Sequence, residues 1–187
     1  MRNKKLLMLC LCVILMLGVC LIAGCKGANT NAEELNSYNL KLYYVNDEYV
    51  ATGNEELDQM MNPYEVTIQS KPEDAYLQAV LKLKEVPLDG YDTMLREEFV
   101  IHSIKANEGI AVVDFSSKDL SGGSMEEGLL LNQIVLTLLS SFDDIQKVQF
   151  TLDGEEAESL MGHLDISKPF TLSNAEGKEN KAVVIAE

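Results

Sequence analysis

The sequence predicts an α/β (α+β) fold in which a compact mixed sheet of about five or six strands is covered by two helices. β-branched and aromatic residues predict a strand at 110–115, and apolar residues at alternating positions predict another at 147–152. Between them, apolar residues from Ser124 to Phe142 recur at spacings of three and four, which predicts a buried helix. If the two strands pair in parallel, the crossover through this helix should be right-handed.

The chain begins with basic residues ahead of an apolar run, namely Arg2, Lys4 and Lys5 before residues 6–23. This order is typical of a secretory signal, although about 20 apolar residues could also remain as a membrane-spanning helix. The run ends in LIAGC, which resembles a bacterial lipobox. We therefore expect residues 1–24 to be a lipoprotein signal peptide and Cys25 to carry a lipid anchor of two or more acyl chains.

The remaining composition narrows the class of protein. The four cysteines all lie at or before position 25 (Cys10, Cys12, Cys20 and Cys25), so the mature domain offers no disulfide or thiolate ligand. The formal charge is −15, and loss of the leader's three basic residues takes it to −18. Such a charge repels nucleic acids and anionic lipid surfaces, whereas basic proteins and cations stay allowed as partners.

The first part of the mature chain predicts a tether and then strands. Residues 25–38 are small and polar, as expected of a linker to the anchor. Alternation predicts a strand at 40–44, and Asn46-Asp47 then predicts a turn into a second strand at 49–51, which together give a hairpin. A further strand is expected at 64–69.

A helix is expected next, because Ser70 precedes Glu73 by three residues and Pro72 suits a first helical turn. Its apolar face consists of Tyr76, Leu77, Val80, Leu81 and Leu83. Strands at 99–105 and 110–115 follow, joined by a hairpin turn in which Gly109 supplies a positive φ.

The last third contains the central helix and a second hairpin. Ser124 and Glu127 have the spacing of a capping box, which predicts the start of the helix. Asp153-Gly154 predicts a two-residue turn between strands at 146–152 and 157–160. We expect the domain to span 39–172 and residues 173–187 to be a tail, in which 182–186 could add an edge strand.

The candidates for chemistry are few. His102 is expected to be a partly buried strand residue, and Asp165 could orient His163. No G-x-S-x-G elbow, H-x-x-x-H pair or phosphate-binding glycine motif occurs, so we expect no enzyme, metal or cofactor. Gly122-Gly123 could cradle an anion at the helix start, but the neighbouring glutamates favour a plain turn. Weak calcium binding by the abundant surface carboxylates stays open.

Several segments in the same order resemble the GerMN domain of sporulation and spore-germination lipoproteins. They are LYYVND at 42–47, NEGIAVVDFS at 107–116, the glycine loop before the helix, KVQFTLDG at 147–154 and GHLDISKP at 162–169. The resemblance covers about 39–171. It implies a compact domain, similar to the ring-building modules of secretion and sporulation channels, that packs against protein neighbours and has no catalytic residues. The family's namesake carries two such domains, whereas this chain has length for one.

We therefore expect a lipoprotein at the outer, extracytoplasmic face of the cytoplasmic membrane. It would act in protein interaction or assembly linked to sporulation or germination, with sporulation-channel components as candidate partners. Gly162, His163 and Asp165 are weak binding candidates in a motif whose first interpretation is structural. The alternative is a module for a small ligand or cell-wall glycan, with a pocket lined by Tyr43, Tyr44 or Tyr64. An enzymatic interpretation would need His163 and Asp165 beside a nucleophile.

Overall fold

The computed structural model describes residues 34–54, 57, 59–172 and 184–186. The expected signal peptide, Cys25 and most of the tail lie outside this set. The elements below all belong to one compact unit, Leu35–Glu187. Within the described part of the chain, no helix is both long and apolar enough to cross a membrane.

The first sheet has three strands in the order β2-β1-β3. β1 (Asn36–Asn46) pairs antiparallel with β2 (Met61–Ser70), and β3 (Tyr91–Asp92) pairs with the end of β1. The prediction of a strand at 49–51 is wrong, because these residues belong to the helix α2 (Asp47–Thr52). Asn46 caps this helix through its side chain, which accepts a hydrogen bond from the Glu48 amide at 3.0 Å. The partner of β1 in the hairpin is therefore β2.

The second sheet has five strands in the order β4-β5-β6-β7-β8. These are β4 (Ile101–Asn107), β5 (Ile110–Phe115), β6 (Lys147–Leu152), β7 (Phe170–Leu172) and β8 (Val184–Ala186). β5 and β6, the two strands joined by the predicted helix, are parallel, and the other pairs are antiparallel. The mixed α+β class is thus confirmed, with the strands divided between two sheets instead of one.

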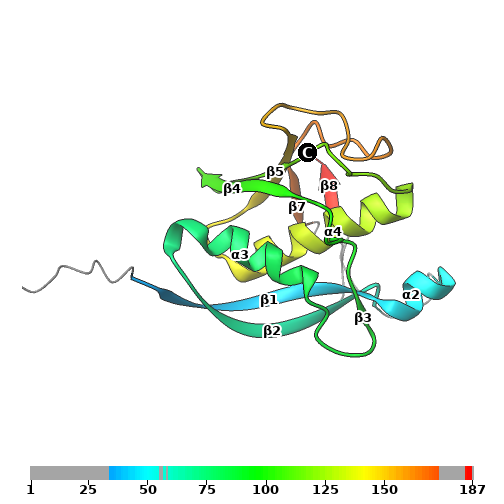
Figure 1. Cartoon of the computed structure of the whole chain (residues 1–187), viewed down its shortest axis with the longest axis horizontal. Coiled ribbons are helices and arrows are strands. Elements are labelled where there is room, and N and C mark those ends of the chain that lie inside the picture. The colour runs from blue at the N-terminus through cyan, green and yellow to red at the C-terminus, as the bar shows by residue number, and fades with distance from the viewer. Residues whose placement is uncertain (1–33, 55–56, 58, 173–183, 187) are drawn as a thin grey trace, which may run out of the picture. The chain divides into compact units, whose positions relative to one another are not determined.

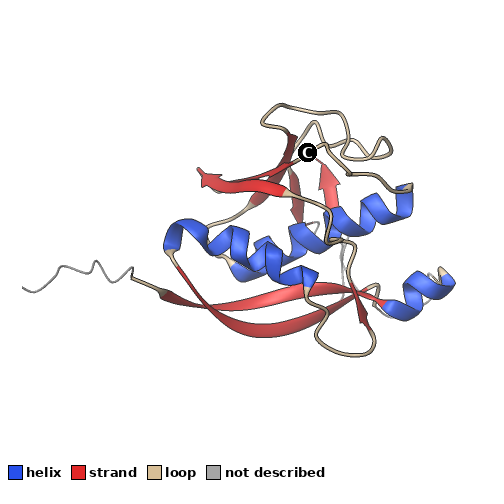
Figure 2. Ribbon diagram, viewed as in Figure 1, coloured by secondary structure: helices blue, strands red, loops and turns tan. Residues whose placement is uncertain are grey.

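Two helices lie between these sheets. α3 (Ala75–Leu81) is flanked by 3₁₀ turns at Pro72–Asp74 and Lys82–Lys84, and α4 (Ser124–Ser141) connects β5 to β6. Figures 1 and 2 show both helices with the β1–β2 ribbon on one side and β4–β5 on the other. One apolar core joins the layers, and its fully buried members include Leu42, Tyr44, Leu83, Phe115, Ile134 and Phe150. The two helices predicted from apolar spacing are confirmed.

Polar side chains of α4 accept hydrogen bonds from backbone amides on the edge of β1 that faces the helix. The Thr137 hydroxyl accepts a hydrogen bond from the Tyr43 amide, and the Ser141 hydroxyl accepts one from the Lys41 amide, both at 3.0 Å. Two residues along a strand and four along a helix advance by nearly the same distance, so the two bonds fit together. The helix thereby substitutes for a strand at this edge.

The two hairpin turns predicted for the second half of the chain are confirmed only in part. Glu108 and Gly109 both have positive φ, which gives the expected two-residue hairpin. Asp153 and Gly154 form a similar turn, but the second strand expected at 157–160 is wrong, since pairing stops at the Leu152–Glu155 bridge. β8 places residues 184–186 at the sheet edge, as expected for the tail.

Candidate functional site

The start of α4 lies one residue earlier than the sequence predicts. Gly123, with extended backbone, is the N-cap, and its amide donates to the Glu126 carboxylate at 2.7 Å. The capping box predicted for Ser124 and Glu127 is therefore wrong. Because Glu126 accepts the hydrogen bond at the helix N-terminus, the Glu127 side chain can point inward, and Glu127 is fully buried.

The buried carboxylate of Glu127 accepts hydrogen bonds from four backbone amides of one loop. One oxygen accepts from Leu160 and Met161 at 2.9 and 3.0 Å, and the other accepts from His163 and Leu164 at 2.9 and 3.3 Å. Bonds from amides to a carboxylate are strong, and together they offset the cost of burying a charge. Glu127 therefore fixes the backbone of this loop.

The loop, residues 153–169 between β6 and β7, contains no regular secondary structure, and Figure 1 shows it arching beside the start of α4. Leu160 and Ile166 are buried and attach it to the core. The Gln149 side-chain amide donates to the Ile166 carbonyl at 2.6 Å, and the Ile166 amide donates to the Glu158 carbonyl at 3.0 Å. The loop is thus ordered by contacts along its length.

The three predicted binding residues lie on this loop, but they do not form one reactive group. Gly162 has a φ of +95° that favours glycine. An imidazole nitrogen of His163 lies 3.1 Å from the Gly122 carbonyl oxygen. The Asp165 carboxylate accepts instead from the Ser167 amide at 2.8 Å, and these Ser167 bonds hold the pKa of Asp165 below its usual value. The expectation that Asp165 orients His163 is wrong.

The other histidine is also placed differently from the expectation. His102 is exposed, because a β-bulge between Ile101 and Ser103 turns it out of the regular alternation. Its ring lies 3.3 Å from the Asp153 carboxylate, which also accepts from the Ser117 amide. Hydrogen bonds from Ser117, followed by that of His102, lower the pKa of Asp153. This cluster joins the adjacent ends of β4, β5 and β6.

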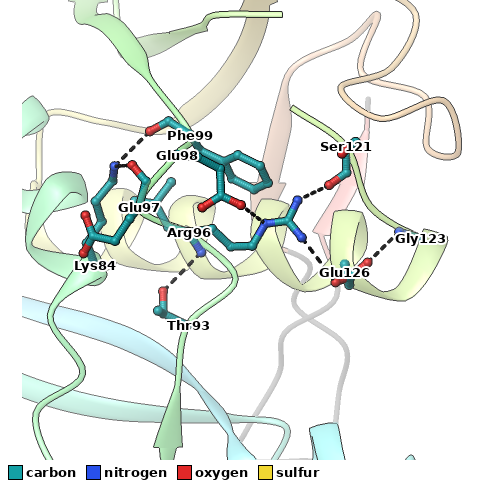
Figure 3. A network of polar contacts seen from close by, with 10 residues as sticks. Lys84, Thr93, Arg96, Glu97, Glu98, Phe99, Ser121, Gly123 and Glu126 are labelled. Carbon is teal, nitrogen blue, oxygen red and sulfur yellow. Dashed lines mark hydrogen bonds and ion pairs between the residues drawn. The ribbon is translucent and has the colours of Figure 1, made fainter. Parts of the chain in front are cut away.

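A second polar network, drawn in Figure 3, fixes the segment before β4. The Arg96 guanidinium contacts the Ser121 carbonyl and lies 3.1 Å from the Glu98 carboxylate and 3.8 Å from that of Glu126. It also stacks on the Phe99 ring, 4.4 Å from the ring centre. Lys84 donates to the carbonyls of residues 97 and 99, each at 2.9 Å.

The tyrosines proposed to line a ligand pocket pack against the protein itself. The rings of Tyr44, Tyr64 and Tyr91 meet edge to face at 5.9 to 6.4 Å. The Tyr44 hydroxyl donates to the Lys82 and Glu85 carbonyls, and burial raises its pKa. Tyr43 points to the opposite face of β1, where Lys41 lies over its ring.

No group of three or more histidine, cysteine or acidic side chains able to hold a metal occurs among the described residues. The polar groups of the site instead bind the chain's own backbone. Sequence reasoning missed the role of Glu127, although a signal was present. Glu127 precedes Leu130 and Leu131 by three and four residues, so the periodicity that predicted the buried face also placed Glu127 on it.

Fold and site together define a small α+β domain whose buried polar side chains order a long loop and a strand edge. The chain belongs to the Germane family, described as sporulation and spore germination, whose profile matches residues 41–158. That match covers more than half of the chain and ends just before the Glu127-bound amides. The family is described by sporulation and germination, not by a catalytic activity. None of the curated proteins compared with the chain matches it.

Two solved structures of GerMN domains agree with this fold. The first GerMN domain of the sporulation protein GerM from Bacillus subtilis is similar with a TM-score of 0.54 at 18% identity, over 68% of this chain and 92% of that one. The tandem GerMN domains of the same protein are similar with a TM-score of 0.52 at 20% identity, over 86% of this chain and 51% of that one. A Clostridium perfringens chain described as a lipoprotein has a TM-score of 0.48 at 20% identity, over 73% of this chain and 87% of that one. The chain thus has the length of about one GerMN copy.

Proposed function

We propose that this protein is a lipid-anchored, extracytoplasmic GerMN-domain protein that acts by packing against protein partners in sporulation or germination. The observation that carries the proposal is the Germane match over residues 41–158 together with the GerMN fold. The internal use of the buried polar groups supports it, since Glu127 and Tyr44 bind backbone of their own chain. The contacts that matter for function are then on the outer surface.

The anchor is the part of this proposal that the sequence supports most directly. Basic residues, an apolar run and LIAGC precede a polar stretch, and the net charge of −15 disfavours direct binding of the chain to anionic lipid. Cys25→Ser should abolish incorporation of a labelled fatty acid and either release the protein or leave an unprocessed precursor. Unchanged acylation and membrane fractionation in this variant would refute the anchor.

The interaction role is tested by crosslinking the tagged full-length protein in intact cells, during growth and during starvation. We expect capture of protein components of the sporulation channel, with more capture during starvation. Recovery of wall polymer alone would contradict the proposal and favour the glycan-binding alternative. A variant with Cys25→Ser is the control for crosslinks that depend only on membrane attachment.

A further inference from the structure

One exposed apolar side chain lies at the start of α4, and another lies on the loop that packs against this helix. Met125 is 45% exposed in the first turn of the helix, and Leu164 is 38% exposed on the 153–169 loop. A β-carbon on Gly128 would lie 3.4 Å from Cδ1 of Leu164, so this leucine rests on the helix. Met125 precedes Gly128 by three residues and therefore shares that helix face. The pair gives an apolar patch contributed by both elements.

The backbone that carries Leu164 is held in place before any partner arrives. The Leu164 amide is one of the four that Glu127 accepts, and Ile166 anchors the chain two residues later. Loops of more than about 12–15 residues without secondary structure are uncommon in compact domains and are usually functional or disordered. This one is ordered, so little conformational entropy would be lost when a partner contacts its exposed side chains.

The charge of the loop that carries Leu164 indicates the kind of partner. Exposed carboxylates on the loop, Asp153, Glu155, Glu156, Glu158 and Asp165, outnumber its single lysine, Lys168, and Arg96 near the start of α4 is already paired with Glu98 and Glu126. The buried carboxylate of Glu127 lies directly beneath the loop, and the chain as a whole carries −15. A negative field of this kind attracts a cationic segment and opposes a second copy of the chain, a nucleic acid or an anionic lipid.

We infer that Leu164, Met125 and the loop carboxylates form a docking surface for a positively charged protein segment bearing an apolar side chain. The apolar side chain of the partner covers Leu164 and Met125, while its basic groups face the glutamates at the rim. This inference rests on the protein-interaction function proposed above and specifies the surface and the chemistry of the partner.

The test is site-specific crosslinking with the full chain in its own cells. A photoreactive amino acid replaces Leu164 or, as a matched control, Leu88, which is 58% exposed on the loop before β3. The expected product at position 164 is a crosslink to a protein segment of net positive charge. Its yield should fall about tenfold when Glu155, Glu156 and Glu158 are all changed to Gln, because the attracting charge at the rim is lost.

The control for charge is the same number of Glu→Gln changes at exposed positions outside the loop, namely Glu65, Glu73 and Glu97, which should alter the yield less than twofold. Capture of a second copy, of an acidic segment or of wall polymer at position 164 would overturn the inference. So would equal yields from the two charge variants. Protein capture at position 88 but not at 164 would refute this surface and leave the interaction function standing, whereas no protein at either position would count against both.

Discussion

Replacement of Glu127 by Gln tests whether one carboxylate orders the 153–169 loop. The change keeps the side-chain shape but turns one acceptor oxygen into a donor, so two of the four amides lose their acceptor. A hydrogen bond to a charged group contributes roughly 1.5–3 kcal/mol, and removal of a buried charge offsets part of the loss. We therefore expect a destabilisation of about 3 kcal/mol out of a total of roughly 5–15 kcal/mol.

The measurement is urea unfolding followed by circular dichroism, combined with amide hydrogen exchange. If the loop opens locally, the amides of residues 160–164 should exchange about 100-fold faster in the variant, since 1.4 kcal/mol corresponds to a factor of ten. The matched control is Glu126→Gln, whose partly exposed side chain keeps an acceptor oxygen for Gly123 and should cost only about 0.5 kcal/mol. Equal unfolding midpoints in the two variants, with unchanged exchange at 160–164, would refute the argument.

Three further changes test other parts of the structure. Thr137→Val removes the acceptor of the Tyr43 amide and should lower the free energy of unfolding by about 1–2 kcal/mol in urea, with an unchanged midpoint counting against edge capping. Gly162→Ala places a β-carbon in open space but at positive φ, so it should cost about 1 kcal/mol in the same assay; a stabilised protein would contradict this conformation. Burial and the 2.5 Å bond to Asp144 raise the pKa of Tyr76 to about 12. Because its pKa is raised in the folded state, Tyr76 contributes stability that is present below pH 10 and lost as the pH rises toward 12. The free energy of unfolding of Tyr76→Phe should therefore fall less than that of wild type between pH 9 and 12. Equal falls in the two proteins would refute the raised pKa of Tyr76.

The sequence was most informative where a segment's periodicity matches its burial. The β-branched and aromatic residues of β5, the alternation in β6 and the apolar spacing of α4 predicted a strand-helix-strand unit, which is present with its two strands parallel. The fold class followed from these segments, and the family resemblance from them together with 42–47 and 162–169. The division into two sheets could not be predicted, because the free edge of β1 is closed by Thr137 and Ser141 of α4, which lie far along the chain.

Local signals failed where one residue type serves two structures. Asn46 favours a turn and also caps a helix, and the following Tyr49 and Val50 have strand propensity. In the structure these two side chains are partly buried against Val45 and Leu136, so packing decides in favour of α2. The exposure of His102 was missed for a similar reason, since alternation alone does not reveal a bulge.

The polar residues on the buried side of α4 explain why the site was missed from the sequence. Gln133, Thr137 and Ser141 recur every four residues, and Glu127 lies earlier on the same helix. Their partners are backbone amides of distant segments: Met94 for Gln133, the β1 edge for Thr137 and Ser141, and residues 160–164 for Glu127. A polar side chain in an apolar stripe must find such a partner when it is buried, so its position in the stripe predicts a tertiary contact even when the partner is unknown. These groups are used within the chain, whereas Met125 in the first turn of α4 stays exposed and belongs to the docking surface inferred above, next to the loop that Glu127 orders.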